Sequence, residues 1–342
     1  MPRSPAPQRA SRLCPPWASG YDGADTGARM TTSTNGDDQN PRYTEAEAAE
    51  LLRATFPDIG SPALRFCGQG SDFCSYAVDE ARILRIGVDD ESALRLNWER
   101  QLLPILAQKL DIASPAFQHV GETPDGAPFV VYPMIQGEPF DDDIYDGLSS
   151  ESRDLIAGQF AAYLRVLHGF PVDKAYEYGI RERRADDVCR EFRDKAKGMI
   201  YPDLSPSELA TCEGLFDRYF GEGYDAYTPA LIHGDLQPRH VLFDRDRSRI
   251  EGIIDYSDIW VGDPDYDLHY LHRQYGDDLL DRLLPRYGHH APDACRWKSG
   301  IFRLCRCMDE IVFGTEDERP DHVADGWRDL RELLAEASSH AA

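Results

Sequence analysis

The sequence is organised around Leu231-Ile-His-Gly-Asp-Leu-Gln-Pro-Arg-His240 and, shortly after it, Gly252-Ile-Ile-Asp255. Short apolar runs flank both segments, and runs of this length that end in polar turns are typical of buried strands. We therefore expect Asp235 and Asp255 at neighbouring strand ends, with His240 five residues after the first aspartate. Phosphoryl transfer from a nucleotide requires a carboxylate beside the attacking hydroxyl and ligands for magnesium. The two loops predict this chemistry.

A simpler interpretation of these aspartates is structural. A single aspartate in a loop is usually a turn or capping residue, and Asp263-Pro264 is ordinary turn chemistry. Two aspartate loops in tandem, each following an apolar run, are much harder to explain as turns. We therefore favour the catalytic interpretation.

The two loops resemble those of the aminoglycoside phosphotransferase family, the small-molecule branch of the kinase-like fold, in His-Gly-Asp235 and in Ile-Ile-Asp255. Most of that family has asparagine five residues after the catalytic aspartate. The 2''-type aminoglycoside phosphotransferases, and more distantly the macrolide phosphotransferases, have histidine there, as this chain has at His240. The resemblance implies that Asp235 is catalytic and that His240 and Asp255 bind Mg²⁺. It also implies that His233 and Asp267 brace the loop by hydrogen bonds.

The same resemblance implies an α+β, bilobal, protein-kinase-like fold. A small N-lobe with an antiparallel sheet, residues 43–137, would bind the nucleotide. A larger, mostly helical C-lobe, residues 138–342, would carry the catalytic groups and bind the acceptor. Residues 1–42 are rich in polar residues, proline and glycine, which predicts a disordered leader. Met30 is a second candidate for the true start of the chain.

Helix signals support this division. Two capping boxes, Thr44-Glu-Ala-Glu47 and Ser205-Pro-Ser-Glu208, predict helices that run to about Phe56 and Phe220. Apolar residues at helical spacing predict further helices. Their approximate ranges are 91–108, 149–168, 184–197, 277–286, 297–313 and 322–335.

The predicted nucleotide site begins in the segment Leu64–Val78, a strand, a glycine-containing turn and a second strand. Gly68 and Gly70 would let the backbone approach phosphates closely, and we place Ser71 with them. A Gly-x-Gly turn alone is more often only a hairpin. A buried strand ends at Met134, and in the family it resembles, the following hinge meets the purine. Both ATP and GTP suit such a hinge as co-substrate.

A buried ion pair is the second expected part of the nucleotide site. In kinase-like folds the third strand carries a cation for the phosphates, paired with a helix glutamate. By resemblance, Arg85 and Glu99 occupy these positions. Relatives generally have lysine in place of Arg85, but arginine keeps the charge and forks to phosphate oxygens. The alternative is a surface arginine and a solvated glutamate.

The amino-acid composition restricts the classes of partner that the protein is expected to bind. The 342 residues carry a formal net charge of -24, which argues against nucleic acid and anionic membranes and favours a cationic acceptor. Strong acidity is equally a solubility device. The eight cysteines have no paired metal-ligand spacing, and neither a membrane-length apolar run nor a signal peptide is present. A reducing cytoplasm is the simplest compartment.

The acceptor is the least determined part. Aminoglycosides carry several ammonium groups and favour carboxylates in the cleft, and Asp258 fits that demand by resemblance. Against this, Arg239 lies inside the catalytic loop, and Leu271-His-Arg-Gln274 replaces an expected acidic cluster. We take an aminoglycoside as the leading acceptor. The alternative acceptors are another hydroxylated metabolite and a macrolide. The alternative function is that of a non-catalytic nucleotide-binding pseudokinase.

Overall fold

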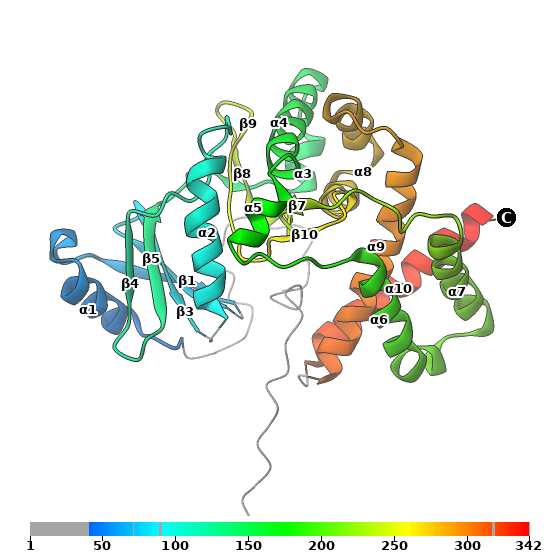
Figure 1. Ribbon diagram of the computed structural model, residues 1–342, viewed down its shortest axis with the longest axis horizontal. Helices are drawn as coiled ribbons and strands as arrows, with labels where there is room; N and C mark the ends of the chain where they lie inside the picture. Colours follow the sequence, from blue (N-terminus) through cyan, green and yellow to red (C-terminus); the bar gives the residue numbers. More distant parts are fainter. Residues whose placement is uncertain (1–40, 71, 89–90, 317–318, 342) are drawn as a thin grey trace, which may run out of the picture.

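The computed structural model describes residues 41–70, 72–88, 91–316 and 319–341. The chain folds into the two-lobed α+β architecture that the sequence predicts, with an antiparallel sheet in one lobe and mainly helices in the other (Figure 1). The predicted leader up to residue 40, Met30 and Ser71 lie outside the described residues.

The sheet lobe has helices on both faces of its sheet (Figure 1). The strands are β1 (Leu64–Gln69), β2 (Phe73–Val78), β3 (Arg82–Gly87), β4 (His119–Glu122) and β5 (Pro128–Pro133), paired in the order β1-β2-β3-β5-β4. Successive side chains of a strand point to opposite faces. Phe129 and Val131 of β5 therefore share a core with α1 (Glu45–Thr55), while Val130 packs in a second cluster with Leu96 of α2 (Ser92–Leu106).

The helical lobe places two small sheets beside the sheet lobe. Their strands are β6 (Glu138–Pro139), β7 (Ala230–Ile232), β8 (Val241–Asp244), β9 (Arg249–Ile253) and β10 (Trp260–Gly262), arranged as β6-β8-β9 and β10-β7. The helices are α3 (Asp142–Asp146), α4 (Ser150–His168), α5 (Val172–Glu177), α6 (Ala185–Met199), α7 (Pro206–Gly221), α8 (Asp265–Tyr287), α9 (Pro292–Glu316) and α10 (Pro320–Ala341).

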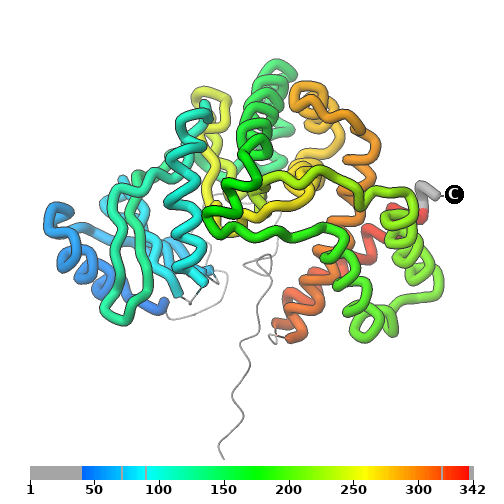
Figure 2. Tube along the Cα trace, in the orientation of Figure 1, coloured from blue at the N-terminus to red at the C-terminus, as the bar shows by residue number. Residues whose placement is uncertain are grey.

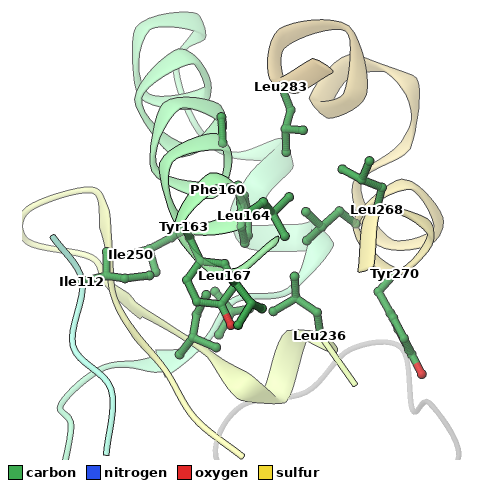
Figure 3. Close-up of a cluster of buried hydrophobic side chains, with 14 of the residues drawn as sticks. Ile112, Phe160, Tyr163, Leu164, Leu167, Leu236, Ile250, Leu268, Tyr270 and Leu283 are labelled. Carbon is green, nitrogen blue, oxygen red and sulfur yellow. The ribbon is translucent and has the colours of Figure 1, made fainter. Parts of the chain in front are cut away.

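Two apolar cores hold this lobe together. The first joins the small sheets to α4 and α8 through side chains such as Phe160, Leu164 and Leu268, which converge in Figure 3. The second joins α6, α7, α9 and α10 (Figure 2). Because the helices of the first core pack against the short strands, the loops at the strand ends are held in fixed positions. None of the described helices combines the length and the apolar character needed to cross a membrane.

Local sequence signals account for several helix starts. Thr44 and Glu47 form the predicted capping box, and so do Ser205 and Glu208. Two helix starts differ clearly from the prediction, and α3 and α5 were not predicted. Helix α9 begins at Pro292, five residues before the predicted range 297–313. Helix α8 begins at Asp265, twelve residues before the predicted range 277–286, and changes direction at Gly276, where φ is 67°. The Gly-Asp-Pro turn therefore leads directly into a helix whose first turn carries Asp267.

Candidate active site

The His-Gly-Asp loop leaves β7 and is fixed by the first turn of α8. The Asp267 carboxylate accepts the backbone N–H groups of His233 and Gly234, both at 2.9 Å. It also lies 3.0 Å from His168 Nε2. Burial opposes ionisation of Asp267, but the hydrogen bonds from His168 and His233 outweigh it and lower the pKa of the carboxyl group. His233 and Asp267 therefore brace the loop as predicted.

Glycine is required at position 234. Its φ is +80°, in the left-handed region. A Cβ atom there would lie 2.2 Å from the Asp258 carbonyl oxygen and 2.4 Å from the Trp260 ring. This close approach packs the catalytic loop directly against the chain that follows Asp255.

Asp235, His240 and Asp255 meet in this structure. Asp235 Oδ2 is 3.4 Å from His240 Nδ1, and Asp255 Oδ2 is 3.4 Å from His240 Nε2. Residues far apart in the sequence thus place two carboxylates at one imidazole. The backbone also joins the loops, because the Ile254 N–H donates to the His240 carbonyl oxygen.

The tautomer of His240 follows from its hydrogen bonds. Nδ1 is 2.8 Å from the backbone carbonyl oxygen of Asp235, which only accepts, so Nδ1 carries the proton and donates. The neutral ring then has its lone pair on Nε2, on the side of Asp255. Burial opposes ionisation of Asp255, but the Arg85 guanidinium and the hydrogen bond from the Ser257 hydroxyl, 2.6 Å from Asp255 Oδ1, hold the pKa of this carboxyl group well below the usual range.

These groups fit a magnesium ion. Adjacent ligands of an octahedral Mg²⁺ are about 3 Å apart, since each bond is about 2.1 Å long. His240 Nε2 and Asp255 Oδ2 are 3.4 Å apart, and the latter side chain is 39% exposed. An imidazole nitrogen is a softer donor than Mg²⁺ usually prefers, but a shell completed by water and phosphate oxygens tolerates it.

Arg85 and Glu99 form a buried ion pair. Their NH1 and Oε2 atoms are 2.9 Å apart, and both side chains are buried. Arg85 NH2 is 3.6 Å from Asp255 Oδ1, and the guanidinium lies 4.1 Å from the centre of the Phe73 ring. A surface arginine and a solvated glutamate are thereby excluded. Glu99 thus holds the Arg85 guanidinium of the sheet lobe in a position that faces the Asp255 loop.

The other predicted nucleotide contacts lie along the sheet lobe. Gly68 lies near the end of β1 and Gly70 in the turn to β2, and a Cβ atom at either position would meet nothing within 4 Å. The N–H of Met134 donates to Ala81 O at 2.9 Å. A nucleobase contact at Met134 would therefore use its carbonyl oxygen. Ser71 lies outside the described residues.

Arg95 is a residue that the sequence did not single out. From α2 it reaches Asp258 Oδ1 at 2.7 Å, Ser257 O at 3.1 Å and Asp72 Oδ1 at 3.3 Å. It therefore bridges the glycine turn, α2 and the segment after Asp255. Burial raises the pKa of Asp258, although Arg95 acts in the opposite direction. A contact between Asp258 and an acceptor would require this buried pair to open, and that contact stays a prediction.

Two neighbours of Asp235 were also not assigned a role from sequence. Gln237 donates from its side chain to Asp235 Oδ1. Arg239 donates from Nε to His240 Nε2 at 3.1 Å, and its NH2 group is 3.7 Å from Asp235 Oδ2. Both residues belong to the quoted loop, so their position in the sequence indicated proximity, but not the direction of their side chains.

A second cluster of metal-ligand types occurs in the described part of the chain, at Asp265, His289 and Cys295. Its geometry does not suit a metal. His289 Nδ1 accepts the Ala291 N–H at 3.1 Å, so the ring proton is on Nε2, which donates to Asp265 at 2.7 Å. The ammonium group of Lys298, 2.8 Å from Asp265 Oδ2, already supplies a cation. This cluster stabilises the start of α8.

A narrow, mainly apolar pocket adjoins the catalytic loop. Its lining includes Trp260, Tyr266 and Phe302, together with the guanidinium-bearing side chains Arg183 and Arg306. Trp260, which lines this pocket, is also the side chain that packs on Gly234, the residue before Asp235. If an acceptor hydroxyl reached Asp235 from this side, the rest of the acceptor molecule would contact the aromatic rings of the pocket.

Comparison with known proteins agrees with this geometry. A family model described as "Phosphotransferase enzyme family" matches residues 63–297. Viomycin phosphotransferase from Streptomyces vinaceus is 26% identical over 211 residues, which cover 59% of this chain and 69% of that protein. A GDP complex of wild-type aminoglycoside 2'-phosphotransferase-IIIa superposes with a TM-score of 0.81 at 26% identity, covering 86% of this chain and 99% of that one. A GDP and kanamycin complex of APH(2")-IIIa gives a TM-score of 0.79 at 28% identity, with 84% and 98% covered.

Proposed function

This chain belongs to the phosphotransferase enzyme family, and on that premise we propose that it transfers the terminal phosphate of ATP or GTP to a hydroxyl group of an aminoglycoside-type antibiotic. The observation that carries the proposal is the convergence of Asp235 and Asp255 on opposite nitrogens of His240. A nucleotide-dependent kinase needs a carboxylate for the acceptor hydroxyl beside groups that bind the metal, which these three side chains would supply, whereas a structural turn needs neither.

Asp235 is the proposed general base. It orients the acceptor hydroxyl and receives its proton as the oxygen forms a bond to the terminal phosphorus. The bond from that phosphorus to the bridging oxygen breaks, and the nucleoside diphosphate leaves with the electron pair. Gln237 holds one carboxylate oxygen of Asp235, which leaves the other to face the hydroxyl.

His240 Nε2 and Asp255 are the proposed ligands of Mg²⁺. The ion, when bound, neutralises charge on the phosphates. Arg85, fixed by Glu99, contributes a second positive charge beside Asp255. Gly68 and Gly70 allow the turn to approach the phosphates. Arg95 holds the turn and the Asp255 segment in one arrangement through Asp72 and Asp258.

The proposed acceptor class is based on the proteins that this chain resembles and on the net charge of the chain. Similar proteins bear the names viomycin phosphotransferase and aminoglycoside phosphotransferase, and one structure contains kanamycin. The net charge of -24 attracts polycations over a distance. Arg183 and Arg306 in the adjoining pocket favour a less cationic molecule, so a macrolide or another hydroxylated metabolite is the second candidate.

The test is a coupled phosphorylation assay with ATP and with GTP against aminoglycosides, macrolides and amino alcohols. Asp235→Asn is expected to lower kcat about 10³-fold while nucleotide affinity changes less than about threefold, because the base acts on the hydroxyl and not on the nucleotide. Turnover of the variant at the wild-type rate would exclude Asp235 as the base. Nucleotide binding without transfer to any acceptor would instead indicate a pseudokinase.

A further inference from the structure

Two buried thiols meet between α6 and α9, in the second apolar core of the helical lobe. The thiol of Cys305 donates to Cys189 Sγ, and the two sulfur atoms are 3.6 Å apart. Cys189 is fully buried and Cys305 is 4% exposed. The two residues are 116 positions apart in the sequence, so their spacing did not indicate a pair. The packing of the two helices brings them together.

One of the two thiols adjoins the narrow pocket beside the catalytic loop. Cys305 lines this pocket together with Ala185 and Val188 of α6 and Phe302 of α9. The volume of the pocket is about 20 Å³, which is enough for a water-sized molecule. Hydrogen peroxide is only slightly larger than water, whereas a peptide-sized thiol reagent is many times larger. We therefore expect the pocket to admit the first to Cys305 and to exclude the second.

A second cysteine on the same helix shows what distinguishes Cys305. Cys307 follows it by two positions on α9 and is 3% exposed, so the two thiols are equally buried. Residues two positions apart on a helix do not share a face. Cys307 does not line the pocket, and it belongs to a different side of α9 from the thiol that meets Cys189. Access and a partner thiol, rather than burial, separate the two residues.

We propose that Cys305 and Cys189 form an oxidation site for hydrogen peroxide, which enters through the pocket and converts the two thiols into a disulfide between α6 and α9. The Cys305 sulfur attacks one peroxide oxygen, the O–O bond breaks and a water molecule leaves, so that Cys305 becomes a sulfenic acid. The Cys189 sulfur then attacks the Cys305 sulfur, the S–O bond breaks and a second water leaves. In total, two thiols lose two electrons and two protons, and one peroxide is reduced to two water molecules.

The geometry allows this bond to form, but slowly. The sulfur atoms of a disulfide are about 2.05 Å apart, so the two thiols, now in contact at 3.6 Å, must approach further by side-chain rotation. The hydrogen bond to Cys189, together with burial, raises the pKa of the Cys305 thiol. Little of the reactive thiolate is therefore present at neutral pH. The site responds to sustained exposure to peroxide rather than to a brief pulse.

Peptide mapping of the folded wild-type protein tests the proposal. The protein is treated with hydrogen peroxide, its remaining thiols are alkylated in urea, and it is digested without reduction. Trypsin releases Cys189 in residues 185–190 and Cys305 in residues 304–306, apart from every other cysteine. The peptide that links these two segments should increase at least about tenfold over untreated protein and should disappear on reduction. Cys307 should remain a thiol.

Glutathione disulfide is the second reagent, because it is too large for the pocket. In the folded protein it should modify Cys67, which is exposed, and leave Cys305 as a thiol. In urea it should modify both residues at similar rates. Selectivity for the small oxidant that disappears on unfolding would show that the fold, and not the intrinsic reactivity of the thiol, controls access.

The matched control variant is Cys307→Ser, which removes an equally buried thiol from the same helix. It should give the linked peptide in the same amount as the wild type. Cys189→Ser and Cys305→Ser should each abolish that peptide. If either of these two variants does not fold, the mapping of the wild type and of Cys307→Ser still decides the question.

Three results would overturn the proposal. The first is that peroxide leaves Cys189 and Cys305 as thiols, the second is that it links either residue to a different cysteine, and the third is that glutathione disulfide modifies Cys305 in the folded protein as fast as Cys67. None of these measurements requires phosphotransfer. The proposed function and the oxidation site can therefore fail independently of each other.

Discussion

Removal of Arg95 should separate the glycine turn from the segment after Asp255. In Arg95→Met the aliphatic stem is kept and the guanidinium is lost. Asp258 would then lose its guanidinium contact at 2.7 Å, and Asp72 would lose its contact at 3.3 Å. The Ser257 carbonyl oxygen would also lose a donor at 3.1 Å.

The expected cost follows from burial. The side chains of Arg95 and Asp258 are each only 6% exposed, and Asp72 is 8% exposed. Breaking a buried pair by removing one partner costs about 3–5 kcal/mol, since the carboxylates that faced the guanidinium stay buried and lose its charge. We expect the free energy of unfolding to fall by about 3 kcal/mol or more.

The assay is urea unfolding followed by tryptophan fluorescence. Arg100→Met is the matched control, because Arg100 lies on the same helix and is exposed. The control should stay within about 0.5 kcal/mol of the wild type. Adding Asp258→Asn to Arg95→Met should recover about 1–3 kcal/mol, because a buried carboxylate that has lost the guanidinium is then replaced by a neutral group. A loss below about 1 kcal/mol in Arg95→Met, or no recovery in the double variant, would refute the bridge.

Further predictions concern the loop and the ion pair. Glu99→Gln should raise the nucleotide KM about tenfold, because Arg85 loses its charged partner; an unchanged KM in steady-state kinetics would count against the pair. Gly234→Ala should lower the thermal unfolding midpoint sharply, since its Cβ collides with Asp258 O and the Trp260 ring; a wild-type midpoint would contradict this. The folded pKa of Asp267 is lowered, so its contribution to stability is present above the unfolded pKa of about 4 and is lost as pH falls through the folded pKa. Acid unfolding of Asp267→Asn should therefore depend less on pH below about 4, and an identical acid limb would exclude that contribution.

Local chemistry is what the sequence predicts well. The capping boxes at Thr44 and Ser205 work through contacts within four residues, so their helices begin where expected. The apolar runs before Asp235 and Asp255 form strands because alternation and turn residues are also local signals. The Arg85–Glu99 pair follows from the resemblance, and the structure buries it.

Long-range geometry explains what the sequence did not predict. Arg95 and Asp258 are 163 residues apart, and nothing in a helix pattern distinguishes an arginine that crosses to another lobe from one that faces solvent. The contact of Asp258 with an acceptor stays a prediction, whereas its pairing with Arg95 was not predicted because it depends on how α2 packs. Helix α8 starts early because Asp263-Pro264 serves as its N-terminal turn, a context that the turn signal alone does not carry.

Asp235, Asp255 and Asp258 each face an arginine. The three pairs differ in distance and in burial, and these differences show which parts of the site are held rigidly. The pairs are Asp258 with Arg95 at 2.7 Å, Asp255 with Arg85 at 3.6 Å and Asp235 with Arg239 at 3.7 Å. Two of the arginines are buried and fixed from the sheet lobe, so they set the geometry before a nucleotide enters. The third, Arg239, belongs to the loop of Asp235 itself, and its side chain is 38% exposed. Asp72 beside Arg95 and Glu99 beside Arg85 add two further carboxylates, so carboxylates outnumber arginines around these pairs. The attraction of the acidic protein for a cationic acceptor weakens as ionic strength rises.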